Sequence, residues 1–220
     1  MAKSKAAAKE SHVVIQPPNI RTALFTLIGT SPYVQHKFSQ KAREKMRRDQ
    51  EAGSQRKKGV KREPKDFRAM YEAAQHRMED GSWGIPAPAF RNACISACRL
   101  CGFKMTLAKL SVFVLPDGYD ADDATPLVRI TEGEPEYLES VVRLASGTTD
   151  LHPRPMWKPG WRAEVRVEFD GDQFSIEDVA NLLSRAGRQV GIGEGRPDSK
   201  SSAGLGWGLF RVAGREEVTR

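Results

Sequence analysis

Glycine is concentrated near the C-terminus, where residues 190–196 read VGIGEGR and residues 204–212 read GLGWGLFRV. Glycine lacks a Cβ atom, so backbone amides there can approach a phosphate closely, and two basic residues between the glycine groups add positive charge. This chemistry predicts contact with a polyanion through Gly193, Gly195, Arg196 and Lys200. The spacing matches neither G-x-G-x-x-G nor G-x-x-x-x-G-K-S/T, and a strand rather than a helix is expected to follow, which argues against a mononucleotide-binding enzyme.

Basic residues are concentrated between positions 37 and 68, where thirteen Lys and Arg stand against five Asp and Glu. Lysine and arginine neutralise phosphates without reading bases, so the run suits a nucleic-acid partner, with a merely solvated loop as the alternative. The candidates for phosphate contact are Lys37, Lys41, Arg43, Arg47, Arg48, Arg56, Lys57 and Lys58. At the start of the run, Tyr33, His36 and Phe38 could stack on bases or pack at the end of a strand.

The chain also has a stretch of the opposite charge, since acidic residues are frequent over residues 117–139. A chain with a basic arm and an acidic face suits a polyanion partner and also head-to-tail association with copies of itself.

Cys94, Cys98 and Cys101 have the C-x-x-x-C-x-x-C spacing that holds the iron–sulfur cluster of radical SAM enzymes. They lie, however, on an apolar helical stripe with Phe90 and Ala97, so we interpret them as small hydrophobic core residues with free thiols. Neither a metal nor another cofactor is expected, because the four histidines show no metal-ligand spacing. They are His12, His36, His76 and His152.

No catalytic residue is assigned, and an enzyme is the less favoured interpretation. Asp49 or Asp66 could assist RNA cleavage if a loop carried either one over bound RNA. A surface carboxylate that balances nearby Lys and Arg is the plainer interpretation of both residues.

The composition indicates a globular protein that is expected to lie in the cytoplasm. The chain has 220 residues, 39% of them hydrophobic, and a net charge of +7. No stretch of about 18 apolar residues could span a membrane, and the N-terminus lacks the apolar segment of a secretory signal. We expect a flexible tail over residues 1–12 and a single domain over 13–220, with residues 37–80 as a basic, partly helical insertion.

The expected elements follow from hydrophobic periodicity and turn residues. Strands are predicted over residues 20–28, 109–115, 126–130, 162–170 and about 206–212, and residues 137–145 are ambiguous between strand and helix. One helix carries the stripe from Phe90 to Cys101, and another follows a capping box at Ser175 and Asp178 and ends at Gly187. The order β-α-β-β-α-β predicts an α+β, ferredoxin-like fold, which RNA-recognition modules also use.

Three segments resemble the RAMP superfamily of CRISPR proteins, in particular the guide-RNA-binding backbone subunit. They are Leu27-Ile28-Gly29-Thr30-Ser31-Pro32, then Gly84-Ile85-Pro86-Ala87-Pro88-Ala89-Phe90-Arg91-Asn92-Ala93, and the glycine-rich segment that ends in Gly206-Trp207-Gly208-Leu209-Phe210-Arg211-Val212. Together they frame residues 20–212. Ala87-Pro88-Ala89 stands where the family has Gly-Ser-Ser, and the spacer over residues 197–203 is long.

The resemblance implies a ferredoxin-like palm that cradles the RNA backbone and a thumb that reaches the next subunit, here the insertion around residues 41–65. It adds Arg91, in the second segment, to the expected RNA-binding residues. The implied partners are guide RNA, target strand, copies of the chain and other effector subunits. A viral or phage protein that binds or anneals single-stranded DNA is the second interpretation, since no residue can be assigned to a 2′-hydroxyl.

Overall fold

A computed structural model describes residues 15–51, 64–143, 149–199 and 204–218, and over these ranges the protein is α+β with two antiparallel sheets. The main sheet is seven-stranded, and its central strands are β1 (Ile20–Gly29) and β9 (Arg162–Asp170). The edge of β1 that faces away from β9 pairs with β10 (Phe210–Val212). The other edge of β9 pairs with β4 (Val112–Leu115) and, nearer its start, with β6 (Pro126–Glu132). Two short strands, β3 (Gly84–Pro86) and β5 (Gly118–Tyr119), pair with β6.

The alternation in β9 determines which side of the sheet is buried. Ala163, Val165, Val167 and Phe169 are buried, whereas the charged residues between them lie toward solvent. This confirms the strand that period-2 alternation predicts. Antiparallel β1 pairs with β9 along its length, so both strands contribute to the same core.

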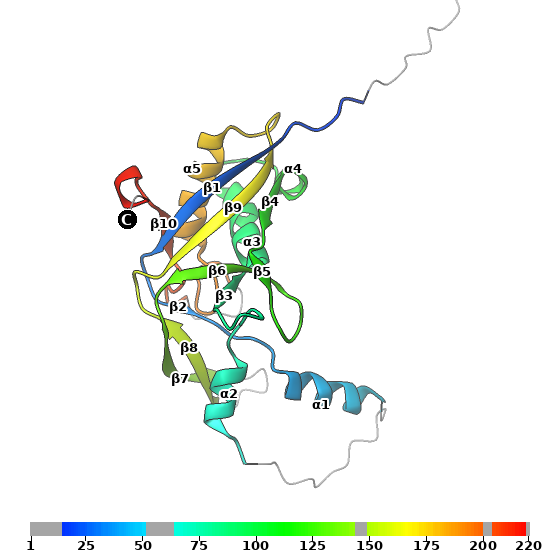
Figure 1. Ribbon diagram of the computed structural model, residues 1–220, viewed down its shortest axis with the longest axis vertical. Helices are drawn as coiled ribbons and strands as arrows, with labels where there is room; N and C mark the ends of the chain where they lie inside the picture. Colours follow the sequence, from blue (N-terminus) through cyan, green and yellow to red (C-terminus); the bar gives the residue numbers. More distant parts are fainter. Residues whose placement is uncertain (1–14, 52–63, 144–148, 200–203, 219–220) are drawn as a thin grey trace, which may run out of the picture.

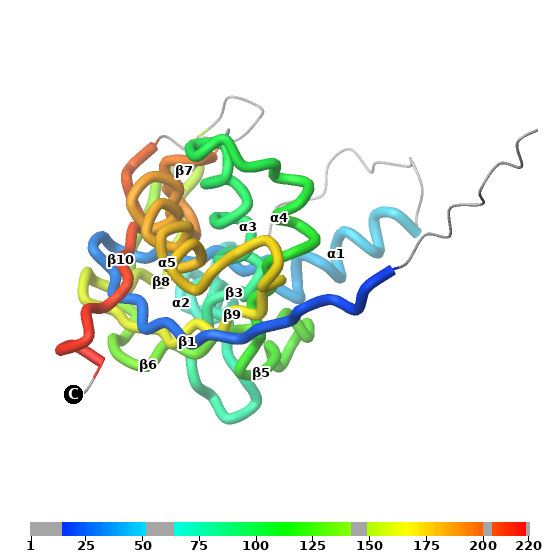
Figure 2. Tube along the Cα trace, turned by 90° about the horizontal axis from the view of Figure 1, so that it is seen from above, coloured from blue at the N-terminus to red at the C-terminus, as the bar shows by residue number. Residues whose placement is uncertain are grey.

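The helices that cover this core lie on one side of β1 and β9, as Figure 2 shows. They are α3 (Ala87–Ala97) with the turn η1 (Cys98–Leu100), α4 (Met105–Ser111), and α5 (Ile176–Arg185) with the turn η2 (Ala186–Val190). The capping box is confirmed: the Asp178 amide donates to Ser175 Oγ at 3.1 Å, and the Ser175 amide donates to the Asp178 carboxylate at 2.9 Å. Among the described residues, no helix is long and apolar enough to cross a membrane.

Three expected boundaries are wrong for identifiable physical reasons. Gly187 does not end α5, because the chain continues through η2 to Gly191, whose φ is 73°. Residues 109–111, the expected start of a strand, belong instead to the helix α4, in which Ala108 and Ser111 are buried at helical spacing. The final strand begins at Phe210, because Gly206 and Gly208 have φ values of 72° and 69°, outside the range of a strand.

The second sheet lies beyond one end of the main sheet (Figure 1) and has the order β2 (Tyr33–Val34), β8 (Thr149–Trp157), β7 (Pro135–Arg143). The described part of the ambiguous segment, residues 137–143, is therefore a strand. The helix α2 (Phe67–Ala73) packs on β8, whereas α1 (Gln40–Glu51) has no buried residue and projects from the body (Figure 1). A last turn, η3 (Arg215–Glu217), follows β10.

Candidate nucleic-acid interface

The segment after β1 and the glycine-rich segment are joined by backbone hydrogen bonds. The Thr30 amide donates to the Leu209 carbonyl at 2.9 Å, and the Gly208 amide donates to the Pro32 carbonyl at 2.7 Å. Further along, the Glu194 amide donates to the Val34 carbonyl at 3.0 Å. Two segments separated by more than 150 residues therefore form one surface.

This surface borders a groove of about 840 Å³. One part of its lining comes from α3, through Ala89, Asn92 and Ser96, and another from the glycine-rich segment, through residues 191–196 and Trp207. His36, just after β2, also lines it. A groove of this size is within the range of ligand sites, roughly 300–1,000 Å³.

The glycines have a backbone conformation that residues with a side chain rarely adopt, but their surroundings differ from the expectation. Gly193, Gly195, Gly204 and Gly206 all have positive φ, between 66° and 75°. A Cβ on Gly193 would lie 2.6 Å from the Val34 carbonyl oxygen, and one on Gly195 would lie 2.6 Å from the Trp207 ring. Those two glycines are therefore required where the loop packs on its own chain, which corrects the expectation that their missing Cβ atoms leave room for phosphate. A Cβ added at Gly204 or Gly206 would meet no atom within 4 Å.

Arginine side chains beside the groove are bound within the chain. Arg196 donates to the Gly193 carbonyl at 2.9 Å and so closes its own loop. Arg154 is buried and pairs with Glu194 at 2.6 Å, and Arg99 donates two bonds of 2.7 Å to Asp198. The carboxylates of Glu194 and Asp198 neutralise Arg154 and Arg99, which reduces the positive charge beside the groove. Lys200 lies outside the described residues.

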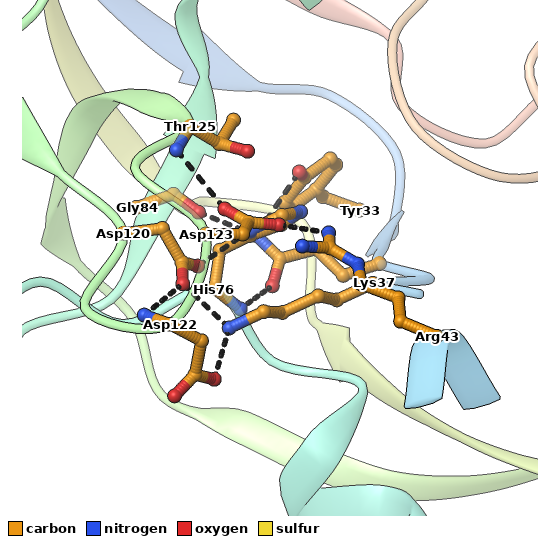
Figure 3. A network of polar contacts seen from close by, with 10 residues as sticks. Tyr33, Lys37, Arg43, His76, Gly84, Asp120, Asp122, Asp123 and Thr125 are labelled. Carbon is orange, nitrogen blue, oxygen red and sulfur yellow. Dashed lines mark hydrogen bonds and ion pairs between the residues drawn. The ribbon is translucent and has the colours of Figure 1, made fainter. Parts of the chain in front are cut away.

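Below the groove, a buried polar network joins three segments (Figure 3). Lys37 Nζ donates to Asp120 at 2.6 Å and to Asp122 at 2.5 Å, and the Lys37 and Asp120 side chains are only 4% and 0% exposed. The His76 ring nitrogen Nδ1 lies 2.8 Å from the other Asp120 oxygen. Lys37 is therefore an internal ion-pair residue, which corrects its assignment as a phosphate contact.

The pKa values in this network follow from burial and hydrogen bonding. Burial would raise the pKa of Asp120, but hydrogen bonds from Lys37, the Asp122 amide and His76 lower it below its usual value. Burial would also raise the pKa of Asp123, but hydrogen bonds from Thr125 and Arg43 outweigh this effect and lower the pKa to about 2. Both carboxylates are thus held ionised by partners.

One group of possible metal ligands is present in the described part of the chain, namely His76, Asp120 and Asp123, whose ligand atoms lie within 4.8 Å of one another. Sequence spacing gave no sign of it, since the residues come from separate segments. Lys37 already binds Asp120, and Arg43 binds Asp123, so the carboxylate charges are balanced by side chains. The arrangement is that of an ion-pair network.

The other predicted phosphate contacts lie mostly on α1. Lys41, Arg43, Arg47 and Arg48 are exposed there, while Arg56, Lys57 and Lys58 lie outside the described residues. Arg47 pairs with Glu51 one turn along at 2.8 Å, a surface pair that contributes little. Arg43 anchors the helix through Asp123.

Two further assignments need correction. Tyr33 is buried against Trp157 and Trp161, with ring centroids 5.5 and 5.6 Å away, so it cannot stack on a base. Arg91 donates to the Val112 carbonyl at 3.0 Å and to the Lys109 carbonyl, so it ties α3 to the start of β4.

His36 and Phe38 keep the exposure that stacking needs. His36 lines the groove, and its ring centroid lies 6.4 Å from that of His152.

The cysteines and aspartates of the enzyme interpretations have structural surroundings. Cys94 and Cys98 are buried on the helical stripe, and Cys101 lies at the surface. Within the described residues, the three thiols do not form a group close enough to share a metal ion. Asp66 caps α2 by accepting from the Ala69 amide at 3.0 Å, and Asp49 lies on the exposed surface of α1.

Comparison with known proteins adds no family to this geometry: neither a family model nor a curated protein matches the sequence. Sequence reasoning also passed over Trp207 and Asn92, both of which line the groove. The signal for Trp207 was its position among the glycines, and Asn92 carried no distinctive signal.

Proposed function

We propose that the chain is an RNA-binding backbone subunit of the RAMP type, which polymerises along a guide RNA in a cytoplasmic CRISPR-type effector complex. It would hold the RNA backbone largely without sequence specificity, next to copies of itself and other effector subunits. The carrying observation is that two of the three segments of the resemblance line one groove and the third is hydrogen-bonded to the glycine-rich segment beside it. Residues 27–32 bond to the glycine-rich segment, and residues 84–93 supply α3, which lines the groove with it.

The strand order supports a ferredoxin-like palm. Along the chain β1, α3, β4, β9, α5 and β10 follow as β-α-β-β-α-β, and in the sheet the order is β10, β1, β9, β4. Both helices cover the same side, so the connection that carries the glycines crosses from α5 to the edge strand β10. This arrangement supports the proposal of a ferredoxin-like palm.

Charge supports a sequence-independent contact through α1. The helix exposes its side chains all round, and its five basic residues stand against three acidic ones. Lys45, Arg47 and Arg48 lie toward the C-terminal end of α1, beyond the anchoring residue Arg43. Lysine and arginine in such a position bind phosphates by charge, so affinity depends strongly on salt.

The test is a charge reversal of this helix. The triple variant Lys45→Glu, Arg47→Glu, Arg48→Glu is titrated with fluorescein-labelled single-stranded RNA over a range of salt concentrations. Each lost phosphate contact should reduce the slope of log affinity against log salt by about one unit. Stability should change little, because α1 has no buried residue.

The control is Arg21→Glu, Arg185→Glu, Arg188→Glu, which changes net charge equally at exposed positions outside α1. If both triple variants bind alike, the effect is general and α1 is not the contact. The nucleic acid that co-purifies decides its kind: discrete RNA of guide size supports the proposal, and heterogeneous DNA supports the annealing protein instead. Absence of salt-sensitive binding by the wild-type chain would overturn both.

A further inference from the structure

Among the described residues, Trp207 differs from the other three tryptophans because its ring contacts neither an aromatic ring nor a cation. Trp157 and Trp161 are fully buried, and Trp83 donates to Gln75 at 2.9 Å with Arg77 stacked on its ring. The Trp207 ring is partly exposed, lines the groove, and pairs with no other aromatic ring or cation among the described residues. Its indole nitrogen donates to no described side chain or carbonyl.

The position of Trp207 is nevertheless fixed. Its amide donates to the Gly195 carbonyl at 3.3 Å, and its ring packs so closely on Gly195 that a Cβ there would lie 2.6 Å from it. An aromatic ring held against backbone on one side and open to a groove is a stacking surface with little entropy left to lose on binding.

Asn92 on α3 lines the same groove and is exposed. Its side-chain amide makes no hydrogen bond with any described residue. An amide offers two donors and an acceptor, the combination that matches the edge of a nucleobase.

We propose that the groove between α3 and the glycine-rich segment holds one nucleobase of the bound strand, stacked on Trp207 and hydrogen-bonded by Asn92. This inference rests on the proposed function and refines it: charge on α1 holds the phosphates, and the groove takes a base. Stacking tolerates every base, because each has a π-face, so the contact is compatible with binding that is largely independent of sequence.

The full-length chain tests this with two probes, a fluorescein-labelled single-stranded RNA and a matched strand of abasic ribose-phosphate units. Trp207→Ala should weaken binding of the first roughly five- to hundred-fold, from the stacking energy of a base on an aromatic ring. The slope against salt should not change, and the abasic strand should bind the wild type and the variant equally. Asn92→Ala should weaken binding of the RNA by a smaller factor.

Trp207→Phe keeps a ring and should restore most of the affinity, which also guards against a folding defect in the alanine variant. Leu110→Ala is the control and should bind like wild type, since Leu110 is 76% exposed on α4 and is not a lining residue of the groove. Equal affinities of wild type and Trp207→Ala for the RNA, with a normal salt slope, would overturn the base site and leave the proposed function standing. Failure of the wild type to bind RNA would overturn both.

Discussion

Replacement of Lys37 by methionine separates a structural from a nucleic-acid role for this residue. The change keeps the length of the side chain but leaves Asp120 fully buried without its ammonium partner. Breaking a buried ion pair from one side costs about 3–5 kcal/mol. For a chain of this size that corresponds to a fall in melting temperature of roughly 6–20 °C.

Urea unfolding at neutral pH measures the effect. Lys45→Met, on the exposed surface of α1, is the matched control and should stay within about 0.5 kcal/mol of wild type. Adding Asp120→Asn to Lys37→Met removes the stranded charge and should restore part of the loss. Burial lowers the pKa of His76, and the charge of Lys37 lowers it further, so the single variant should also regain stability as acid protonates His76 beside Asp120. If Lys37→Met unfolds like wild type and instead loses RNA affinity, Lys37 is a phosphate contact and the reasoning from burial is wrong.

Two further predictions concern stability. Gly193→Ala should lower the free energy of unfolding more than Gly204→Ala, since both positions have positive φ but only the first variant places a Cβ against Val34 and Tyr33. Urea unfolding of the two variants compares these losses of stability. Equal losses would refute the packing argument. Asp123, with a pKa of about 2 against a usual 3.8, contributes stability that is present above pH 3.8 and is lost as the pH falls toward 2. In Asp123→Asn the difference in unfolding free energy between these conditions should shrink by about 2 kcal/mol, and an unchanged difference would contradict it.

The sequence predicts well those strands and helix caps that are determined by residues close together in the chain. The alternation in β9, the strand β1 and the capping box of α5 are encoded within about ten residues each, and all three are confirmed. Strand β8 was missed because Pro153 and Pro155 argue against a strand, although β8 pairs with β7 across both positions.

The site was predictable only in part, because its side chains take their roles from distant partners. Glycine at position 193 suits the positive φ found there, but the sequence does not show that Val34 fills the space beside it. Lys37 looks like the first residue of a basic run, and only the fold brings Asp120, 83 positions away, to its ammonium group. Local patterns thus reveal the type of a residue and its backbone, and not what it touches.

This distinction changes how the basic run should be counted. Two basic residues of the run, Lys37 and Arg43, bind Asp120 and Asp123 and hold the base of α1 in place. Charges committed to internal carboxylates release no counterions from a nucleic acid, so they add nothing to the slope of affinity against salt. Arg47 and Arg48, toward the C-terminal end of α1, are exposed. We therefore expect the slope of log affinity against log salt to be shallower than the number of basic residues in the run would give. A slope that matches this number would require phosphate contacts elsewhere in the chain.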